Sequence, residues 1–492
     1  MKVSMGTNVI LITVDCLRAD HVGFGGYKIS TTPFLDDLAS ESIVFEKAIV
    51  AGMPTYYSFP AILASRYPLA FGRKFIGLAK REPTLVSTLH NTGFRTAAFI
   101  AGNPYLSQHF NYHQDFDVFE DFHEYNQAAS FSKLSRESTS GAISKSLKTR
   151  TNELARTLFE RANATRTLYR ELYFRYYSRE MVRVRNGNLD LFRRYPSADI
   201  VVEKAIKWLQ NVTDGQVFLW LHLMDPHYPF YPPAEALQAL GYGEIDLQRM
   251  VYLNTVWDQD DVDIHHLRPS VADIVALYDG GVRWVDQQVC RLIEALKDLG
   301  KWDNTLFILV GDHGEEFLEH GGHYHHPEKL SQELIHVPLL LRQPSAKSPI
   351  RLSSPFSLLD LAPTLLSMQG IAPPDTFVGV SRWQGHRIQE DENPSAITEI
   401  VRGSRNPWSV EDRMGARLLA VQDERYKLVF DFSTGKEQLF DLLNDPAELT
   451  PVALNREASS LTKLFEVARE HLRMRPLNRA RLNARLGYLR AR

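Results

Sequence analysis

The sequence has 492 residues, of which 44% are hydrophobic and 23% are charged, a composition typical of globular proteins. Its net charge of -3 gives no indication of nucleic-acid binding, and two cysteines cannot build a disulfide-rich scaffold. No stretch reaches the roughly 18 uncharged apolar residues that a membrane-spanning helix needs. The first residues lack the apolar core and cleavage site of a signal peptide. We therefore expect a cytoplasmic protein.

The first predicted elements alternate between strands and helices. Residues 9–14 and 96–100 are short apolar runs of the kind found in strands that are buried on both faces of a parallel sheet. Between them, residues 85–89 have helical spacing, and Thr55 precedes another apolar helical stretch. A hydroxyl at a helix N-terminus lies where backbone N–H groups favour an anionic substrate, although a threonine there can also serve only as an N-cap.

Residues 126–194 differ in composition from the rest of the chain. Basic side chains outnumber acidic ones, and Ser and Thr are frequent. Helices are predicted by the spacing of Leu154, Leu158, Leu168, Leu172 and Tyr173. We expect a solvated helical insertion. A lid, or a docking face for an anionic polymer or membrane surface, is the alternative.

Strands and helices alternate again after the insertion. Strands are predicted at residues 217–221, 305–310 and 337–341, and helices at 201–209 and 271–299. This alternation is typical of a doubly wound α/β sandwich.

The pattern changes after about residue 385. Residues 418–421 and 426–430 are joined by a polar turn and predict a β-hairpin. A further strand at 439–442 and a helix from about Ser459 follow. We therefore expect a catalytic domain over 1–385 and a small α+β subdomain over 386–492.

Polar side chains follow three of the predicted strands directly. Asp15 ends the first strand, His222 closes the strand at 217, and Asp312 with His313 follows the strand at 305. Functional sites in such sheets lie at the carboxyl ends of the strands. A carboxylate and an imidazole in succession can bind a divalent cation, which lowers the pKa of a coordinated hydroxyl such as that of Thr55. Histidines could then protonate the leaving oxygen of a phosphate or sulfate ester.

Longer motifs surround these residues: residues 8–21 (NVILITVDCLRADH), 32–39 (TPFLDDLA), 64–68 (ASRYP), 222–230 (HLMDPHYPF), 311–326 (GDHGEEFLEHGGHYHH), 333–339 (ELIHVPL), 426–428 (YKL), 439–442 (LFDL) and 445–446 (DP). Together they resemble the sulfatase family of the alkaline phosphatase superfamily over nearly the whole chain except the basic insertion. The resemblance implies an α/β fold, an alkaline-phosphatase-like α/β/α sandwich with a small C-terminal antiparallel sheet subdomain. It also implies hydrolysis of sulfate esters, with a small molecule, glycan or lipid ester as substrate.

The roles of the family can be carried over to matching positions. Asp15, Asp312 and His313 match its metal ligands. Its nucleophile position falls on Thr55, which the resemblance makes a metal ligand as well. In sulfatases that residue is a Cys or Ser that is converted to formylglycine, and threonine is not a substrate for this conversion. Some members of the superfamily, including phosphodiesterases and lipoteichoic acid synthases, use an unmodified threonine.

Several positions depart from the family pattern. Cys16 replaces a second aspartate, which removes one hard oxygen ligand. Phe59 stands where an arginine is expected, and Asn103 and Tyr105 stand where the family has a lysine and a histidine. We expect Asn103 and Tyr105 to line the substrate pocket. The cofactor expected is one divalent metal ion, Ca or Mn, with Zn as the alternative.

The resemblance also assigns the histidines. His222 and His325 are expected to assist the leaving group, and His227 to contact the substrate. Asp225 and His227 could instead order their loop by hydrogen bonds, or bind a second metal ion together with His325. Three further histidines are expected to be loop or supporting residues: His320, His323 and His326.

Three hypotheses follow from these observations. The first is hydrolysis of sulfate esters with Thr55 as the metal-coordinated nucleophile. The second is phosphodiester cleavage, or transfer of a phosphate-bearing head group, which the unmodified threonine and the basic insertion favour. The third is an inactive protein that binds an anionic polymer, which the changes at Cys16 and Phe59 favour.

Overall fold

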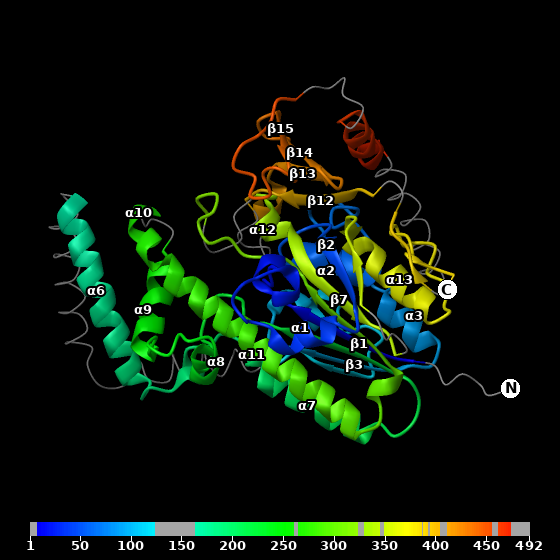
Figure 1. Ribbon diagram of the computed structural model, residues 1–492, viewed down its shortest axis with the longest axis horizontal. Helices are drawn as coiled ribbons and strands as arrows, with labels where there is room; N and C mark the ends of the chain where they lie inside the picture. The colour runs from blue at the N-terminus through cyan, green and yellow to red at the C-terminus, as the bar shows by residue number, and fades with distance from the viewer. Residues whose placement is uncertain are drawn as a thin grey trace.

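The computed structural model describes residues 7–123, 163–259, 264–322, 329–344, 349–385, 387–391, 394–403, 411–454 and 461–473. Its centre is a nine-stranded sheet in the order β4-β3-β5-β1-β6-β7-β2-β8, with β9 also paired to β2 (Figure 1). The strands are β1 (Asn8–Val14), β2 (Ile43–Ile49), β3 (Arg95–Ile100), β4 (Val118–Glu120), β5 (Val217–Leu223), β6 (Thr305–Gly311), β7 (His336–Arg342), β8 (Ile350–Leu352) and β9 (Phe356–Ser357).

The sheet is mixed rather than wholly parallel. Strands β4, β3, β5, β1 and β6 are parallel, whereas β7 runs antiparallel to both β6 and β2. Residues 337–341 thus lie in a strand, as predicted, but this strand is antiparallel to its neighbours and not part of a wholly parallel sheet. The described part of the connection from β6 to β7 contains the short helix α12 (Gln332–Ile335) and no long crossover helix. An apolar strand is buried on both faces in either direction, so its composition does not reveal its direction.

Helices cover both faces of the sheet, as the alternating pattern predicts. Ile10, Ile12 and Val14 of β1 face a core shared with α1 (Pro33–Ala39), α7 (Ala198–Asn211) and α11 (Val271–Asp298). Val9 and Leu11 face the opposite core, which contains α2 (Thr55–Ala64), α3 (Leu85–Asn91) and α13 (Leu361–Met368). Fully burying an aliphatic side chain of this size contributes about 1.5–3 kcal/mol. Burial on both faces therefore fixes β1 firmly at the centre of the sheet.

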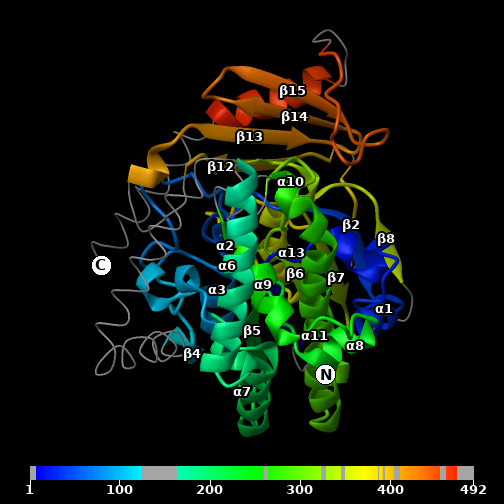
Figure 2. The same cartoon turned by 90° about the vertical axis from the view of Figure 1, so that its left-hand side faces the viewer.

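A second group of helices lies at one end of the molecule. Helix α6 (Asn163–Val184) packs on α9 (Leu247–Trp257), close to α8 (Ala234–Ala239) and α10 (Ile264–Leu267), and Figures 1 and 2 show α6 and α9 side by side. Leu172 and Tyr173 lie exposed on α6. The predicted helical positions Leu154 and Leu158 fall outside the described residues.

The C-terminal part contains a small antiparallel sheet. Its strands β12 (Ala396–Val401), β13 (Arg417–Gln422), β14 (Tyr426–Asp431) and β15 (Lys436–Asp441) pair in chain order, which confirms the predicted hairpin. A helix over residues 461–473 packs on this sheet, and the short strands β10 (Trp383–Gln384) and β11 (Arg387–Ile388) pair with each other. The small sheet lies across one edge of the central sandwich (Figure 1).

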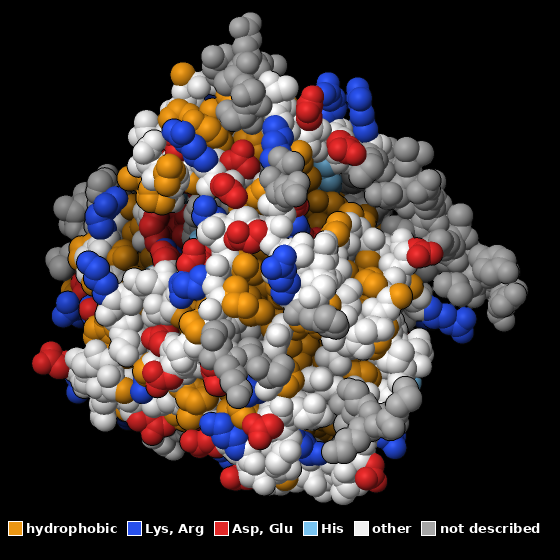
Figure 3. Space-filling model, turned by 45° about the vertical axis from the view of Figure 1, so that its right-hand side comes forward, with side chains coloured by type: hydrophobic (Ala, Val, Ile, Leu, Met, Phe, Trp, Pro, Cys, Tyr) orange, Lys and Arg blue, Asp and Glu red, His pale blue; other side chains and the backbone are white. Residues whose placement is uncertain are grey.

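The surface matches the near-neutral composition. On the face drawn in Figure 3, basic and acidic side chains are interspersed with apolar ones, and neither sign dominates. Among the described residues, no helix combines the length and apolarity that a bilayer crossing requires.

A buried ion pair fixes the segment that follows α2. Arg66 is 1% exposed, and its Nε donates to Glu82 Oε1 over 2.5 Å. Arg66 Nη2 donates to the carbonyl oxygen of Gly77 over 3.0 Å, and the Arg66 guanidinium lies 4.4 Å from the Phe71 ring centre. These contacts give the motif at residues 64–68 a structural role.

We expect Arg66→Met to lower the free energy of unfolding by about 3–5 kcal/mol, because the Glu82 carboxylate would remain buried without its partner. The exposed pair of Lys204 and Glu120 offers a control, and Lys204→Met should cost less than about 1 kcal/mol. Chemical denaturation of both variants measures the difference. Equal losses would contradict a special role for the buried pair.

Candidate active site

Four neighbouring parallel strands deliver the polar residues of the site. β1 lies between β5 and β6, in a register that pairs Thr13 with His222 and Val14 with Gly311. Asp15 and Asp312 therefore leave the sheet side by side. On the far side of β5, the segment after β3 carries Asn103 into the same region. The predicted convergence at the carboxyl ends of the strands is confirmed for these residues.

Thr55 enters the site from the first turn of α2. Its Oγ1 lies 3.2 Å from Asp15 Oδ2 and 3.2 Å from His313 Nε2, and the residue is 4% exposed. One turn further along the helix, Ser58 Oγ donates to the backbone carbonyl of Asp312 over 2.7 Å. This bond ties α2 to the end of β6, so the hydroxyl of Thr55 is held against the two acidic strand ends.

The donor atoms fit a divalent cation. Asp312 Oδ1 accepts the backbone N–H groups of Cys16 (3.2 Å) and His313 (2.9 Å). Within the described residues, Asp312 Oδ2 is buried without a hydrogen-bond partner, and His313 Nε2 lies 3.7 Å from it and 3.5 Å from Asp15 Oδ1. Two carboxylates, an imidazole and the Thr55 hydroxyl form a donor set suited to Mn²⁺, Zn²⁺ or Ca²⁺. The structure thus brings together all four predicted metal ligands.

The two carboxylates differ in their protonation behaviour. Burial alone would raise the pKa of Asp15, but the charge of His227, a hydrogen bond from His222 and the charge of His313 hold it well below its usual range. Burial, together with the negative charge of Asp15, raises the pKa of Asp312. Two buried carboxylates this close repel each other when both are ionised, and a cation between them would remove that repulsion.

Cys16 places a thiol beside the site. Its Sγ lies 3.3 Å from Asp15 Oδ1 and 3.7 Å from Glu315 Oε2, and its carbonyl accepts the Tyr278 hydroxyl over 2.8 Å. Burial and the charge of Asp15 raise the pKa of this thiol. Burial raises the pKa of Glu315 to about 8. Glu315 was not among the predicted site residues, although its place two residues after His313 could have indicated a role.

His222 is held at both ring nitrogens. Its Nε2 lies 3.1 Å from Asp15 Oδ2, and its Nδ1 lies 2.9 Å from Thr13 Oγ1, which also accepts the Trp220 indole N–H. Phe59 packs edge-on against the His222 ring, with centroids 5.2 Å apart. The phenyl ring at the position where the family has an arginine thus forms an apolar support for the histidine.

Asn103 contacts the cluster directly, whereas Tyr105 lies at its border. Asn103 Nδ2 donates to Asp15 Oδ2 over 2.9 Å. The ring of Tyr105 packs edge-on against Tyr56, the residue after Thr55, with centroids 5.2 Å apart. Both therefore lie close to the nucleophile position.

The HLMDPHYPF motif supplies one structural residue and one residue that faces the site. Asp225 accepts the backbone N–H of Ala198 over 3.0 Å at the start of α7, which supports the interpretation that it orders the loop. A ring nitrogen of His227 lies within 4.8 Å of both an Asp15 oxygen and Cys16 Sγ. His325, the other predicted member of this group, lies outside the described residues, as do His323 and His326.

His320 forms a separate polar cluster. Its Nδ1 lies 2.9 Å from Glu333 Oε1, and its backbone N–H donates to Glu316 Oε1 over 2.9 Å. Lys329 Nζ lies 3.0 Å from the same Glu316 oxygen. These contacts are consistent with the predicted supporting role in the loop.

Sequence comparison relates the chain to known hydrolases. The Sulfatase family profile matches residues 7–371, and the profile of N-sulphoglucosamine sulphohydrolase, C-terminal, matches residues 319–475. Arylsulfatase K of Mus musculus is 28% identical over 278 residues, or 51% of this chain and 49% of that protein. The chain thus spans about half the length of such relatives. An arylsulfatase of Clostridium perfringens is 23% identical over 490 residues, or 92% of this chain and 91% of that protein.

Solved structures share the fold. The phosphonate monoester hydrolase SpPMH from Silicibacter pomeroyi superposes with a TM-score of 0.62 at 18% identity, over 96% of both chains. BT4656, solved in complex with its substrate D-glucosamine-2-N,6-O-disulfate, gives a TM-score of 0.64 at 16% identity, over 96% of this chain and 99% of that one. These similarities confirm the predicted alkaline-phosphatase-like fold.

The hydrogen bond between Glu333 and His320 raises the pKa of this histidine from 6.5 to about 9. A group with a raised pKa binds its proton more tightly in the folded protein, so the stabilisation is complete below pH 6.5 and is lost as the pH rises through 9. We expect His320→Gln to lower the melting temperature at pH 6, and the difference from wild type to shrink towards pH 10. A difference that does not change with pH would contradict the assignment.

Proposed function

Because the chain belongs to the sulfatase family, we propose that it hydrolyses sulfate esters and that Thr55 is the nucleophile. The observation that carries this proposal is the position of Thr55 Oγ1, which lies 3.2 Å from both Asp15 Oδ2 and His313 Nε2. A hydroxyl in the first turn of a helix also faces backbone N–H groups that favour a bound anion. These features support a role for Thr55 as an attacking group rather than as a simple helix cap.

Sulfatases generally use a divalent metal ion. In this chain Asp15, Asp312, His313 and Thr55 would hold it, and Cys16 offers a sulfur beside Asp15. Such an ion lowers the pKa of a bound hydroxyl and neutralises the charge of the ester. Since a thiol replaces a hard oxygen ligand at Cys16, we propose that Zn²⁺ suits the site better than Ca²⁺.

The proposed reaction has two displacement steps. Thr55 Oγ1 attacks the sulfur, a new O–S bond forms, and the bond between sulfur and the alcohol oxygen breaks. The leaving oxygen takes up one proton, which balances the proton that the Thr55 hydroxyl loses. Water then attacks the sulfur of the sulfate ester on Thr55 and the bond between sulfur and Oγ1 breaks; one proton of the water restores the Thr55 hydroxyl, and the other is released with sulfate.

The neighbouring side chains divide the supporting roles. Asp15 Oδ2 accepts the hydrogen bond of Thr55 and so orients its hydroxyl for attack. His222, held at both nitrogens, positions Asp15. A ring nitrogen of His227 lies within 4.8 Å of an Asp15 oxygen, and we propose that His227 protonates the leaving oxygen with the assistance of His325.

The charge of the site favours an ester with one negative charge. Phe59, Asn103 and Tyr105 stand where the family has an arginine, a lysine and a histidine, so three cationic side chains are absent from these positions. Fewer fixed positive charges stabilise a dianionic phosphate monoester less well than a monoanionic sulfate ester. Phosphate monoesters are therefore expected to be poor substrates.

Phosphodiester cleavage is the second candidate. A phosphodiester also carries one negative charge, and an unmodified threonine is the nucleophile of phosphodiesterases in the superfamily. The structural similarity to a phosphonate monoester hydrolase is compatible with this reaction. Family membership and the arylsulfatase relatives favour sulfate esters as the first choice.

We expect Thr55→Ala to lower kcat/KM for 4-nitrophenyl sulfate by roughly a thousandfold or more, because the variant lacks the attacking oxygen. Thr55→Ser keeps the hydroxyl and serves as the control, with a substantially smaller loss. The assay compares an aryl sulfate, a phosphate monoester and a phosphodiester for all three proteins. Full activity of Thr55→Ala would refute the nucleophile, and turnover of the phosphodiester alone would select the second candidate.

A second prediction concerns the metal ion. Asp312→Asn should lower bound divalent metal, measured by mass spectrometry of the purified protein, because it removes a negative ligand from the buried cluster. Cys16→Asp should instead raise the affinity for Ca²⁺ relative to Zn²⁺ by about tenfold, since a hard oxygen replaces the thiol. Unchanged metal selectivity in Cys16→Asp would show that the thiol does not influence the ion.

A further inference from the structure

Helix α6 has an inner and an outer face, and it is the outermost of the labelled helices in Figure 1. Phe174 is buried on the inner face, in a core that also contains residues of α9. Leu172, Tyr176 and Arg179 follow one another at intervals of four and three positions, which places them together on another side of the helix. The outer face consists of six exposed residues: Leu172, Arg175, Tyr176, Arg179, Arg183 and Val184.

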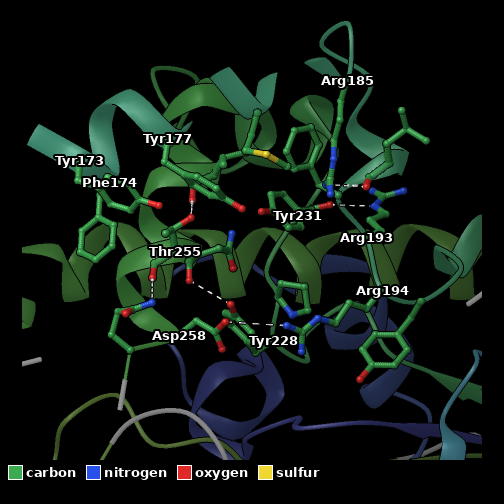
Figure 4. A pocket seen from close by; sticks show the side chains of 18 of the residues that line it. Tyr173, Phe174, Tyr177, Arg185, Arg193, Arg194, Tyr228, Tyr231, Thr255 and Asp258 are labelled. Carbon is green, nitrogen blue, oxygen red and sulfur yellow. Dashed lines mark hydrogen bonds and ion pairs between the residues drawn. The ribbon is translucent and has the colours of Figure 1, made fainter. Parts of the chain in front are cut away.

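Large apolar side chains are exposed more densely here than in the rest of the described chain. Of the fifteen such side chains that are exposed in the described residues, six lie between residues 172 and 191: Leu172, Tyr173, Tyr176, Tyr177, Val184 and Leu191. Tyr173, Tyr177 and Leu191 also line a cavity of about 720 Å³ between α6 and α9 (Figure 4). Leu172 and Tyr176 do not line it, and they are 60% and 56% exposed. Scattered exposed apolar residues are ordinary, whereas a cluster of them marks an interaction surface.

The same segment is strongly basic. Residues 163–194 contain eight arginines and three acidic residues, a net charge of +5 in a chain whose net charge is -3. On the outer face, the side chains of Arg175 and Arg183 are 70% and 79% exposed. Each forms an ion pair with a glutamate of the same helix, and both glutamates are already included in the net charge. The segment therefore attracts an anionic partner.

We propose that the outer face of α6 docks on an anionic lipid bilayer. Leu172, Tyr176 and Val184 enter the boundary between the head groups and the acyl chains, where tyrosine places its ring among apolar groups and its hydroxyl in water. The arginines of the same face extend to the lipid phosphates. This surface goes beyond the proposed hydrolysis and does not depend on it.

Two other kinds of partner fit the outer face less well. A second copy of the chain, related by a twofold axis, would bring the arginines of both outer faces together, and like charges repel. A water-soluble polyanion would pair with the arginines but would leave Leu172 and Val184 exposed to water. A bilayer with anionic head groups accommodates the apolar and the basic side chains at once.

Sedimentation of the full chain with vesicles tests the proposal. Vesicles of phosphatidylcholine alone are compared with an equimolar mixture of phosphatidylcholine and phosphatidylglycerol. We expect the protein to bind the anionic vesicles about tenfold or more tightly, and less tightly as salt is added. Leu172→Ser/Tyr176→Ser and Arg179→Gln/Arg183→Gln should each weaken this binding by about tenfold at an unchanged melting temperature.

Matched controls come from exposed residues elsewhere on the protein. Leu449→Ser removes an apolar side chain that is 68% exposed, and Lys204→Gln/Arg291→Gln removes two exposed positive charges from α7 and α11. Both controls should bind the anionic vesicles as tightly as the wild type.

Three results would overturn the proposal. The first is no binding of the wild type to anionic vesicles, or binding that neither α6 variant weakens. The second is a dimer, detected by light scattering, that Leu172→Ser/Tyr176→Ser dissociates, because the face would then belong to a second copy. The third is binding of dextran sulfate without binding of vesicles, which would assign the face to a soluble polyanion. Turnover of 4-nitrophenyl sulfate decides the proposed reaction separately and has no bearing on these results.

Discussion

The site depends on the position of Asp15 at the end of the central strand. β1 is held between two parallel partners and buried on both faces, so its end is fixed relative to the ends of β5 and β6. One carboxylate oxygen of Asp15 meets Thr55, Asn103 and His222, and the other lies near Cys16 and His313. A change of register by one residue would turn this carboxylate to the opposite face and separate these groups.

Much of the fold could be predicted because apolar runs and helical spacing reflect which side chains are buried. β1, β3, β5 and β6 appear where the sequence predicts them, as does the hairpin of β13 and β14. The direction of a strand could not be predicted from its apolar residues, and β7 is antiparallel to both of its neighbours. β2 was not predicted: it carries the charged pair Glu46 and Lys47, which interrupts the apolar pattern, and its pairing is irregular there.

The site could be predicted where a motif and a strand end coincide. Asp15, Asp312 and His313 follow directly from two strands, and Thr55 precedes an apolar helix. The local sequence does not reveal contacts between distant segments. Phe59 supports His222, and Cys16 lies beside Glu315, although the members of each pair are far apart in the chain. The cavity beside α6 likewise joins residues of α6 to residues of α9 (Figure 4).

Helix α6 packs on α9 and lies outside the layers that hold β1 in place (Figure 1). The groups proposed to cleave the ester belong to the sheet and α2, whereas much of the wall of the cavity beside α6 belongs to this peripheral helix and the segment after it. Substitutions along the inner side of α6 can therefore reshape this cavity while the register of the central strands stays the same. The wall of this cavity and the groups proposed for the reaction can thus change independently of each other.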